Sequence, residues 1–211
     1  MKNLYRLLPA VALAAAVLAA FPARAQQKGA MQIGLAARYT WPGMDLQTLE
    51  PAPDYGLIFH YFLTSTTSID VNVDYLMLSK SLDAPGGHAD LDYTMGDLAF
   101  GMRYRPKLDL VVRPFAEGGL GYEFWSSKLD VSGAQTRTGN SIIYYAGLGY
   151  DWEFAEDFTM TTTARYYYLP LREHLEDEVV TSAGGAQRVH SADVLNASLM
   201  TAGIELTWRF K

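Results

Sequence analysis

The sequence predicts an all-β fold, namely an eight-stranded antiparallel up-and-down transmembrane β-barrel. Three observations predict it: eight stretches alternate apolar and polar residues, one face of every stretch lacks charge, and the connections alternate in length. Alternation by itself is typical of any half-buried strand. An uncharged face shared by every strand is instead the pattern of a barrel wall that faces lipid.

The first three expected strands, 31–40, 54–64 and 68–78, place their apolar residues at odd numbers. The stretch SIDVNVDYLML in the third strand shows the pattern best, because apolar side chains there alternate with Asp and Asn. A strand with this period has one apolar and one polar face.

The remaining strands place their apolar residues at even numbers. The fourth strand is 97–105. In residues 91–95 before it, the apolar residues are at odd numbers instead, so we expect a β-bulge near Gly96. The last four strands are 110–124, 141–154, 158–168 and 199–210. Pro114 lacks a backbone N–H, and we therefore expect a second bulge early in the fifth strand.

Charge is confined to one face of these strands. The apolar face carries no Asp, Glu, Lys or Arg. The opposite face carries Arg38, Asp54, Asp70, Asp74, Asp97, Arg103, Arg105, Arg113, Glu117, Glu123, Asp151, Glu153, Arg165, Glu205 and Arg209. This segregation predicts that the charged face lines the lumen of a closed sheet.

The connections and the aromatic residues agree with a spanning barrel. Short connections follow the second, fourth and sixth strands, and long ones follow the first, third, fifth and seventh, which is typical of periplasmic turns and extracellular loops. Aromatic residues gather at both ends, as expected at two membrane interfaces. They are Trp41, Tyr122, Trp125 and Tyr168 toward the long loops, and Trp152, Phe154, Phe158, Trp208 and Phe210 toward the short turns.

The N-terminal residues predict export. Residues 1–25 hold two basic residues, an apolar run and Ala23-Arg24-Ala25, the pattern of a secretory signal peptide cleaved after Ala25. The barrel domain then covers 26–211 and has 14 basic and 23 acidic residues, a formal charge of −9. Such an acidic export product is not expected to bind nucleic acid, and the lack of cysteine excludes a disulfide scaffold.

Three segments, 103–122, 144–154 and 203–210, resemble the small outer-membrane β-barrel superfamily, the porin-family proteins of the eight-stranded OmpA/OmpX-like and OmpW-like types. The likeness covers the whole mature chain. It implies a monomer in the outer membrane of a Gram-negative cell envelope, in contact with lipid and lipopolysaccharide. The segment GIELTWRF resembles the C-terminal signal read by the outer-membrane assembly machinery, although Lys211 follows Phe210.

Several of the inward charges form the first candidate site. We expect them to pair and plug the lumen, because a narrow lumen desolvates single charges. The alternative is a gated path for ions or solutes. The residues toward the short-turn half are Arg103, Arg113, Glu117, Asp151, Glu153, Glu205 and Arg209.

A second candidate site lies toward the long loops, where inward positions are apolar. These residues either pack together beneath the loops or line an apolar pocket for a small hydrophobic ligand, which the resemblance to OmpW-like proteins implies. They are Ile58, Leu76, Leu78, Ile143, Tyr145, Tyr167, Leu169, Leu195 and Leu199.

An enzyme is the remote alternative. Some small barrels change the acyl chains of lipid A with a His and Ser set at the outer rim, and His190 with Ser191 is the nearest such pair. Neighbours on a strand point to opposite faces, so these two side chains are a poor base and nucleophile. His88 and His174 also fall in expected loops, and the acidic segment 172–180 lacks regular metal-ligand spacing.

The sequence therefore predicts an integral outer-membrane barrel with an envelope-structural or surface-interaction role. We expect no catalysis, cofactor or metal. A narrow channel or pocket for small hydrophobic solutes is the alternative function.

Overall fold

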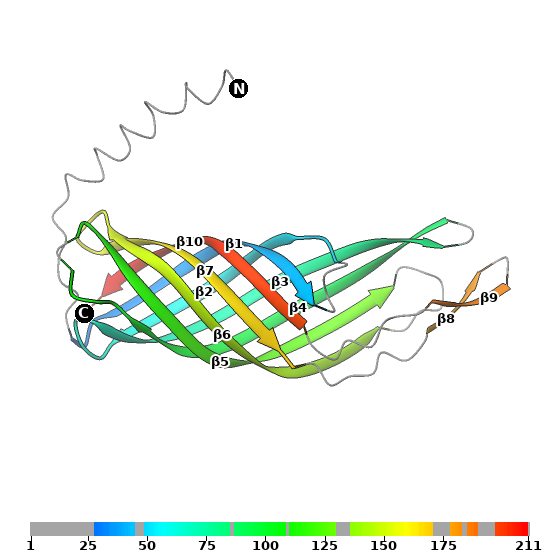
Figure 1. The fold of residues 1–211 in the computed structure, drawn as a ribbon, viewed down its shortest axis with the longest axis horizontal. Coiled ribbons are helices and arrows are strands. Elements are labelled where there is room, and N and C mark those ends of the chain that lie inside the picture. The colour runs from blue at the N-terminus through cyan, green and yellow to red at the C-terminus, as the bar shows by residue number, and fades with distance from the viewer. Residues whose placement is uncertain are drawn as a thin grey trace, which may run out of the picture.

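The computed structural model describes residues 28–44, 49–84, 87–108, 110–129, 136–170, 178–182, 185–189 and 197–210. Within these ranges, eight strands close into one antiparallel barrel (Figure 1). They are β1 (Met31–Met44), β2 (Ala52–Phe62), β3 (Thr67–Ala84), β4 (Gly87–Tyr104), β5 (Val112–Leu129), β6 (Arg137–Glu153), β7 (Phe158–Leu169) and β10 (Ala197–Phe210). Between β7 and β10, the short strands β8 (Glu178–Ser182) and β9 (Gly185–Val189) pair with each other.

The barrel is an up-and-down meander whose last strand returns to its first. Strands β1 to β7 each pair with their sequence neighbours, and β10 pairs with β7 on one side and β1 on the other. The closing ladder runs unbroken from Met31↔Phe210 to Met44↔Ala197. The predicted fold class is confirmed, and the described residues contain no helix of the length and apolarity needed to cross a membrane.

Side chains alternate between the two faces of the sheet as the sequence indicates. On β7, Thr159, Thr161 and Thr163 are buried in the lumen, while the alternate residues Thr162 and Ala164 are exposed. The large outward residues form a continuous apolar surface, here called the apolar belt. It includes Ile33, Leu35, Tyr55, Leu57, Val73, Tyr75, Leu98, Phe100, Leu120, Tyr122, Ile142, Leu148, Tyr166, Ile204 and Leu206.

The apolar belt ends at a similar level on neighbouring strands. On β3 the last apolar outward residue is Met77, which pairs with Thr94, and on β5 it is Phe124, which pairs with Asn140. The hairpins β3–β4 and β5–β6 continue beyond this level and form the long end of the barrel (Figure 1). Their outward residues there are Ser79, Ser81, Asp92, Thr94, Ser126, Lys128, Thr138 and Asn140.

The connection between β3 and β4 differs from the expected long loop. The two strands extend until only residues 85–86 separate them. Ladder pairs continue through Leu78↔Tyr93 and Ser79↔Asp92 to Ala84↔Gly87. Leu78 and Tyr93 are both buried on the inner face, and this burial stabilises the pairing just above the apolar level of the outer face.

The expected bulge near Gly96 is absent. The β3–β4 ladder passes without interruption through Leu76↔Met95, Tyr75↔Gly96 and Asp74↔Asp97. Tyr93 and Met95 therefore point into the lumen, where both are buried. The prediction was wrong because it assumed that apolar residues on this strand face lipid, whereas the upper lumen is itself apolar.

Pro114 also lies in a continuous ladder, paired with Tyr150 of β6, so the second expected bulge is absent too. The ladder between β4 and β5 ends at Tyr104↔Ala116. Toward β4, Pro114 therefore lies beyond the last pair, at a local sheet edge where proline is tolerated.

Trp125 is a further correction, because it does not belong to the outer aromatic belt. Its side chain is only 6% exposed and stacks on Tyr93 inside the barrel, with ring centroids 5.5 Å apart. Tyr122 and Phe124 take the outward positions beside it.

The boundary of the apolar belt can be tested with two substitutions on the outward face of β5. Leu120→Arg places a charge in the middle of the belt and should destabilise the inserted barrel by about 2–4 kcal/mol. Ser126→Arg, beyond the belt, should cost little. Equilibrium urea unfolding from lipid vesicles measures both, and equal losses at the two positions would contradict the assigned boundary.

Candidate functional site

Two arginines and two glutamates form the centre of the lumen. Arg103 (β4) and Arg165 (β7) each bond both Glu117 (β5) and Glu205 (β10). The nitrogen–oxygen distances are 2.9 and 3.0 Å from Arg103, and 2.6 and 2.8 Å from Arg165. All four side chains have no exposed surface, so four strands are held together across the barrel axis by charge-assisted bonds.

The network continues toward the short-turn end. Arg103 and Arg105 both bond Asp151, which also accepts a bond from the Thr161 hydroxyl at 2.7 Å. The Arg103 guanidinium lies over the ring of Phe115, 4.0 Å from its centroid. This cation–π contact is favourable, and the two side chains together help to fill the lumen at this level.

Asp70 extends the same network to a histidine that the sequence did not single out. His60 Nδ1 lies 2.8 Å from Asp70 Oδ1, and the Ser68 hydroxyl donates to the same oxygen at 2.7 Å. Arg103 Nε lies 3.2 Å from the other oxygen of Asp70. Ser68 therefore bonds the carboxylate and not the imidazole, so these three residues are not arranged as a nucleophile with its base.

Toward the long end, one arginine donates hydrogen bonds to three carboxylates. Arg38 (β1) donates to Asp74 at 2.7 Å, to Asp54 at 3.4 Å and to Glu205 at 3.3 Å. It therefore links the central network to the acidic residues above it.

The predicted ion-pair residues fall into two groups. Arg103, Glu117, Asp151 and Glu205 belong to the central network just described. The other three form a second group at the short-turn end, where Glu153 accepts bonds from Arg113 at 3.3 Å and Arg209 at 2.7 Å. This second group is less buried than the first.

Sequence reasoning left several members of the central network out of the site. Arg38, Arg105, Arg165, Asp70 and Asp74 all have the inward parity, and that parity was the signal that could have found them. Their height along the barrel, which decides which of them meet, depends on the register between strands.

Glycines make room for this network. A Cβ on Gly147 would lie 2.9 Å from both the Glu117 carboxylate and the Arg165 side chain. A Cβ on Gly101 or Gly119 would collide with the ring of Tyr145. These inward positions must therefore lack a side chain for large residues to cross so narrow a lumen.

A buried apolar cluster closes the lumen toward the long end. Of the predicted pocket residues, Leu76, Leu78, Ile143, Tyr145, Tyr167, Leu169 and Leu199 belong to it. Ile58 is buried but lies outside the cluster, and Leu195 lies outside the described residues. The cluster also contains Tyr93 and Met95, which the expected bulge had hidden, and Trp125, which was expected among the interface aromatics.

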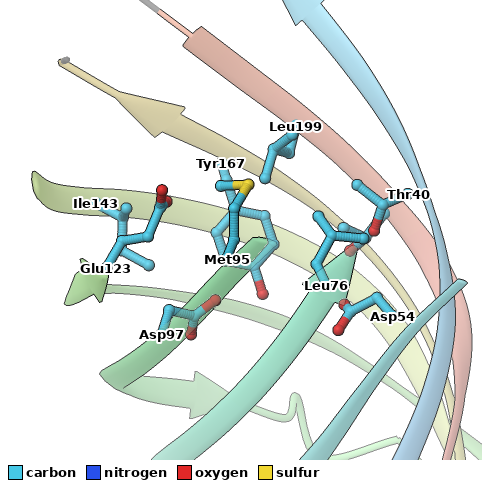
Figure 2. Close-up of a pocket in the computed structure, with 10 residues that line it drawn as sticks. Thr40, Asp54, Leu76, Met95, Asp97, Glu123, Ile143, Tyr167 and Leu199 are labelled. Carbon is cyan, nitrogen blue, oxygen red and sulfur yellow. The ribbon is translucent and has the colours of Figure 1, made fainter. Parts of the chain in front are cut away.

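Between the apolar cluster and the ion-pair network lies a small cavity (Figure 2). The volume open to the centre of a water-sized molecule is about 20 Å³, which is room for one or two waters. Its walls combine apolar side chains with three carboxylates. The lining residues are Thr40, Asp54, Leu76, Met95, Asp97, Glu123, Ile143, Tyr167, Leu199 and Thr201.

The described part of the structure does not bring together the enzyme and metal candidates that the sequence suggested. His174, His190, Ser191 and the greater part of the acidic segment 172–180 lie outside the described residues, and His88 falls within β4. In the part of the chain that is described, no three His, Asp or Glu side chains are placed to enclose a metal ion.

Comparison with known proteins agrees with this architecture. The family model described as outer membrane protein beta-barrel domain matches residues 10–210. This chain belongs to that family. No curated protein matches its sequence.

Solved structures of the same fold share little sequence with this family member. OprG from Pseudomonas aeruginosa has a TM-score of 0.58 and 13% identity, over 88% of this chain and 97% of its own. Ail of Yersinia pestis, solved with a heparin analogue, has a TM-score of 0.53 and 11% identity, over 87% and 100%. Neisserial surface protein A has a TM-score of 0.54 and 16% identity, over 84% and 98%. At these identities the likeness shows the fold alone.

Removal of one arginine from the central network should strongly lower the free energy of unfolding of the barrel. Arg103→Met leaves Glu117, Glu205 and Asp151 short of one buried cation and should cost about 3–5 kcal/mol. Arg113→Met, in the less buried group at the short-turn end, should cost clearly less. Unfolding in urea from lipid vesicles compares the two variants, and equal losses would contradict the separation into a central and an outer group.

Proposed function

We propose that this family member is an exported, monomeric outer-membrane protein whose closed barrel has an envelope-structural or surface-interaction role and no catalytic activity. One observation carries the proposal: the lumen is occupied at two levels, by the Arg103–Glu117–Arg165–Glu205 centre and by the apolar cluster above it. A barrel filled in this way offers no continuous aqueous path. Its large exposed features are then the belt and the two long hairpins.

The hairpins β3–β4 and β5–β6 support the surface role. They extend beyond the apolar belt with outward Ser, Thr, Asn, Asp and Lys residues, which suit water and not hydrocarbon. In the proposed orientation they face the cell exterior, whereas residues 63–66, 105–108, 110–111 and 154–157 face the periplasm. Outer-membrane lipid and lipopolysaccharide then cover the belt.

Export and assembly complete the proposal. Residues 1–25 act as a signal peptide cleaved after Ala25, and the strand β10, with its alternating apolar residues, is read by the assembly machinery. Pairing of β10 with β1 then closes the sheet.

A path for small hydrophobic solutes is the second candidate. The buried apolar cluster beside the cavity favours it, because such side chains suit an apolar ligand. The cavity is too small for a solute of several heavy atoms, so this function requires the cluster to rearrange.

The orientation can be tested with single cysteines, because the chain has no cysteine of its own. Ser79→Cys, beyond the belt on β3, should react with a membrane-impermeant maleimide in intact cells. Asp157→Cys, in the opposite turn, should react only after the outer membrane is permeabilised. The reverse pattern would overturn the orientation.

Conductance distinguishes the two functions. Reconstituted into planar bilayers, the wild-type protein should show little conductance, because both filled levels block the lumen. Discrete conductance steps that change when Arg113→Gln or Glu117→Gln is introduced would favour a solute path and contradict the closed barrel.

A further inference from the structure

Charge is unevenly distributed along the lumen. In the central and short-turn part, the described residues pair five carboxylates (Asp70, Glu117, Asp151, Glu153 and Glu205) with five arginines (Arg103, Arg105, Arg113, Arg165 and Arg209). Around the cavity, four carboxylates (Asp54, Asp74, Asp97 and Glu123) face one arginine, Arg38. The acidic excess is therefore concentrated at the cavity.

Arg38 does not balance this excess. Its shortest bond goes to Asp74, and its others are shared between Asp54 and Glu205. In the described part of the chain, Asp97 and Glu123 form no ion pair, and Asp97 Oδ1 and Glu123 Oε1 have no hydrogen-bond partner. Lys80 on the same face of β3 lies four residues beyond Leu76, above the level of the apolar belt.

The cavity also presents hydroxyl oxygens that are independent of the acidic residues. Thr40 is 0% exposed and Thr201 is 2% exposed, and both line the cavity. The Oγ1 atom of each is buried without a hydrogen-bond partner among the described residues. Glu123, which is 1% exposed, is buried in the same way. Buried polar atoms are rarely left unsatisfied, so their convergence on one cavity points to a bound ligand.

The ligand must be positively charged and small. An uncompensated buried carboxylate is costly, and either a proton or a cation can remove that cost. Carboxylate and hydroxyl oxygens are ligands of hard cations. The cavity holds only one or two water-sized groups, which excludes a large organic cation.

The spacing of the carboxylates decides between divalent and monovalent cations. Divalent ions in proteins gather several oxygens at short range, but no three acidic side chains of the described residues are placed to enclose one ion. In Figure 2, the carboxylates of Asp54 and Asp97 point toward the space in front of the Tyr167 hydroxyl from opposite walls. This wider arrangement suits a singly charged ion that keeps a water molecule.

We propose that this cavity binds one monovalent cation, such as an alkali ion or ammonium, between Asp54 and Asp97, with the Thr40 and Thr201 hydroxyls as further ligands. The ion serves as the counter-charge that the upper lumen lacks. The proposal concerns the interior of the barrel and does not depend on what the hairpins contact.

Stability at constant ionic strength tests this proposal. The full mature protein, refolded in detergent micelles at mildly alkaline pH, is heated in potassium chloride or in choline chloride, whose cation is too large for the cavity. The heat-induced shift in gel mobility reports unfolding. Potassium should raise the unfolding temperature relative to choline, and the difference should saturate with concentration, as expected for a specific site. Sodium and ammonium are tested in the same way to rank the cations.

Variants assign the effect to the cavity. Asp97→Asn removes a half-buried ligand of the ion, and Glu123→Gln removes a buried unpaired charge nearby, so both should fold. Asp97→Asn should lose most of the difference between potassium and choline, and Glu123→Gln should lose part of it. Glu153→Gln, in the group at the short-turn end, should retain that difference. An unchanged difference in both cavity variants, or no difference in the wild type, would overturn the proposal.

Two direct measurements locate the counter-charge. A crystal soaked in rubidium chloride should show anomalous density between Asp54 and Asp97. Infrared spectroscopy of the wild type at the same pH should show no carbonyl band from a protonated Glu123, that is, no carboxylic acid band that is lost in the Glu123→Gln variant. Such a band would mean that protons neutralise the cavity, and it would overturn the cation site while leaving the closed barrel intact.

Discussion

Hydrogen bonding of the backbone in hydrocarbon is the constraint on which the rest of this structure depends. Lipid offers no partner for an N–H or C=O group, so a membrane-spanning sheet must pair every strand on both sides. The ladder between β10 and β1 meets this requirement by joining the two ends of the sheet. Once the sheet is closed, each residue faces either lipid or the lumen, and the chemistry of the protein is divided between these two environments.

The lumen of an eight-stranded barrel is narrow enough to be filled by side chains. The inward faces of the strands place arginine and carboxylate groups in the lumen. These groups must pair there, because little water is present to solvate them. Arg103 and Arg165 satisfy this need at the centre by sharing Glu117 and Glu205. Farther up, the same narrowness favours apolar packing, as the stacked rings of Tyr93 and Trp125 show. Among the described residues, the carboxylates between these two levels are the part of the lumen that arginine side chains do not balance.

The fold was predictable because its signal has a period of two and repeats on every barrel strand. Inward and outward faces could therefore be assigned from residue parity, and Asp70, Asp74 and Glu205 are indeed buried while Val73 and Ile204 are exposed. Parity does not give height along the barrel, which depends on the register of each ladder. For this reason the sequence could not show that Arg38 reaches Asp74 and Glu205, or that Glu153 stays apart from Glu117.

The error near Gly96 came from treating the apolar residues before it as part of the lipid face. Leu91, Tyr93 and Met95 are apolar and point inward, because the lumen above the charged centre is apolar too. The apolar residues of this strand therefore change from the outward to the inward face near Gly96 because the lumen changes from charged to apolar there. The backbone itself has no bulge. The cavity beside Met95 could not be predicted either, since its lining comes from residues on all eight barrel strands, whose registers were unknown.

Accessibility of nitroxide labels tests most directly whether the outward face lies in hydrocarbon. Single cysteines at Val73, Leu98 and Leu148 carry the label, and oxygen and a water-soluble nickel complex serve as the two relaxation agents in lipid vesicles. All three positions should be accessible to oxygen and protected from nickel, because oxygen partitions into hydrocarbon and the complex does not. Strong relaxation by nickel, or protection from both agents as in a protein interior, would contradict the lipid-facing barrel.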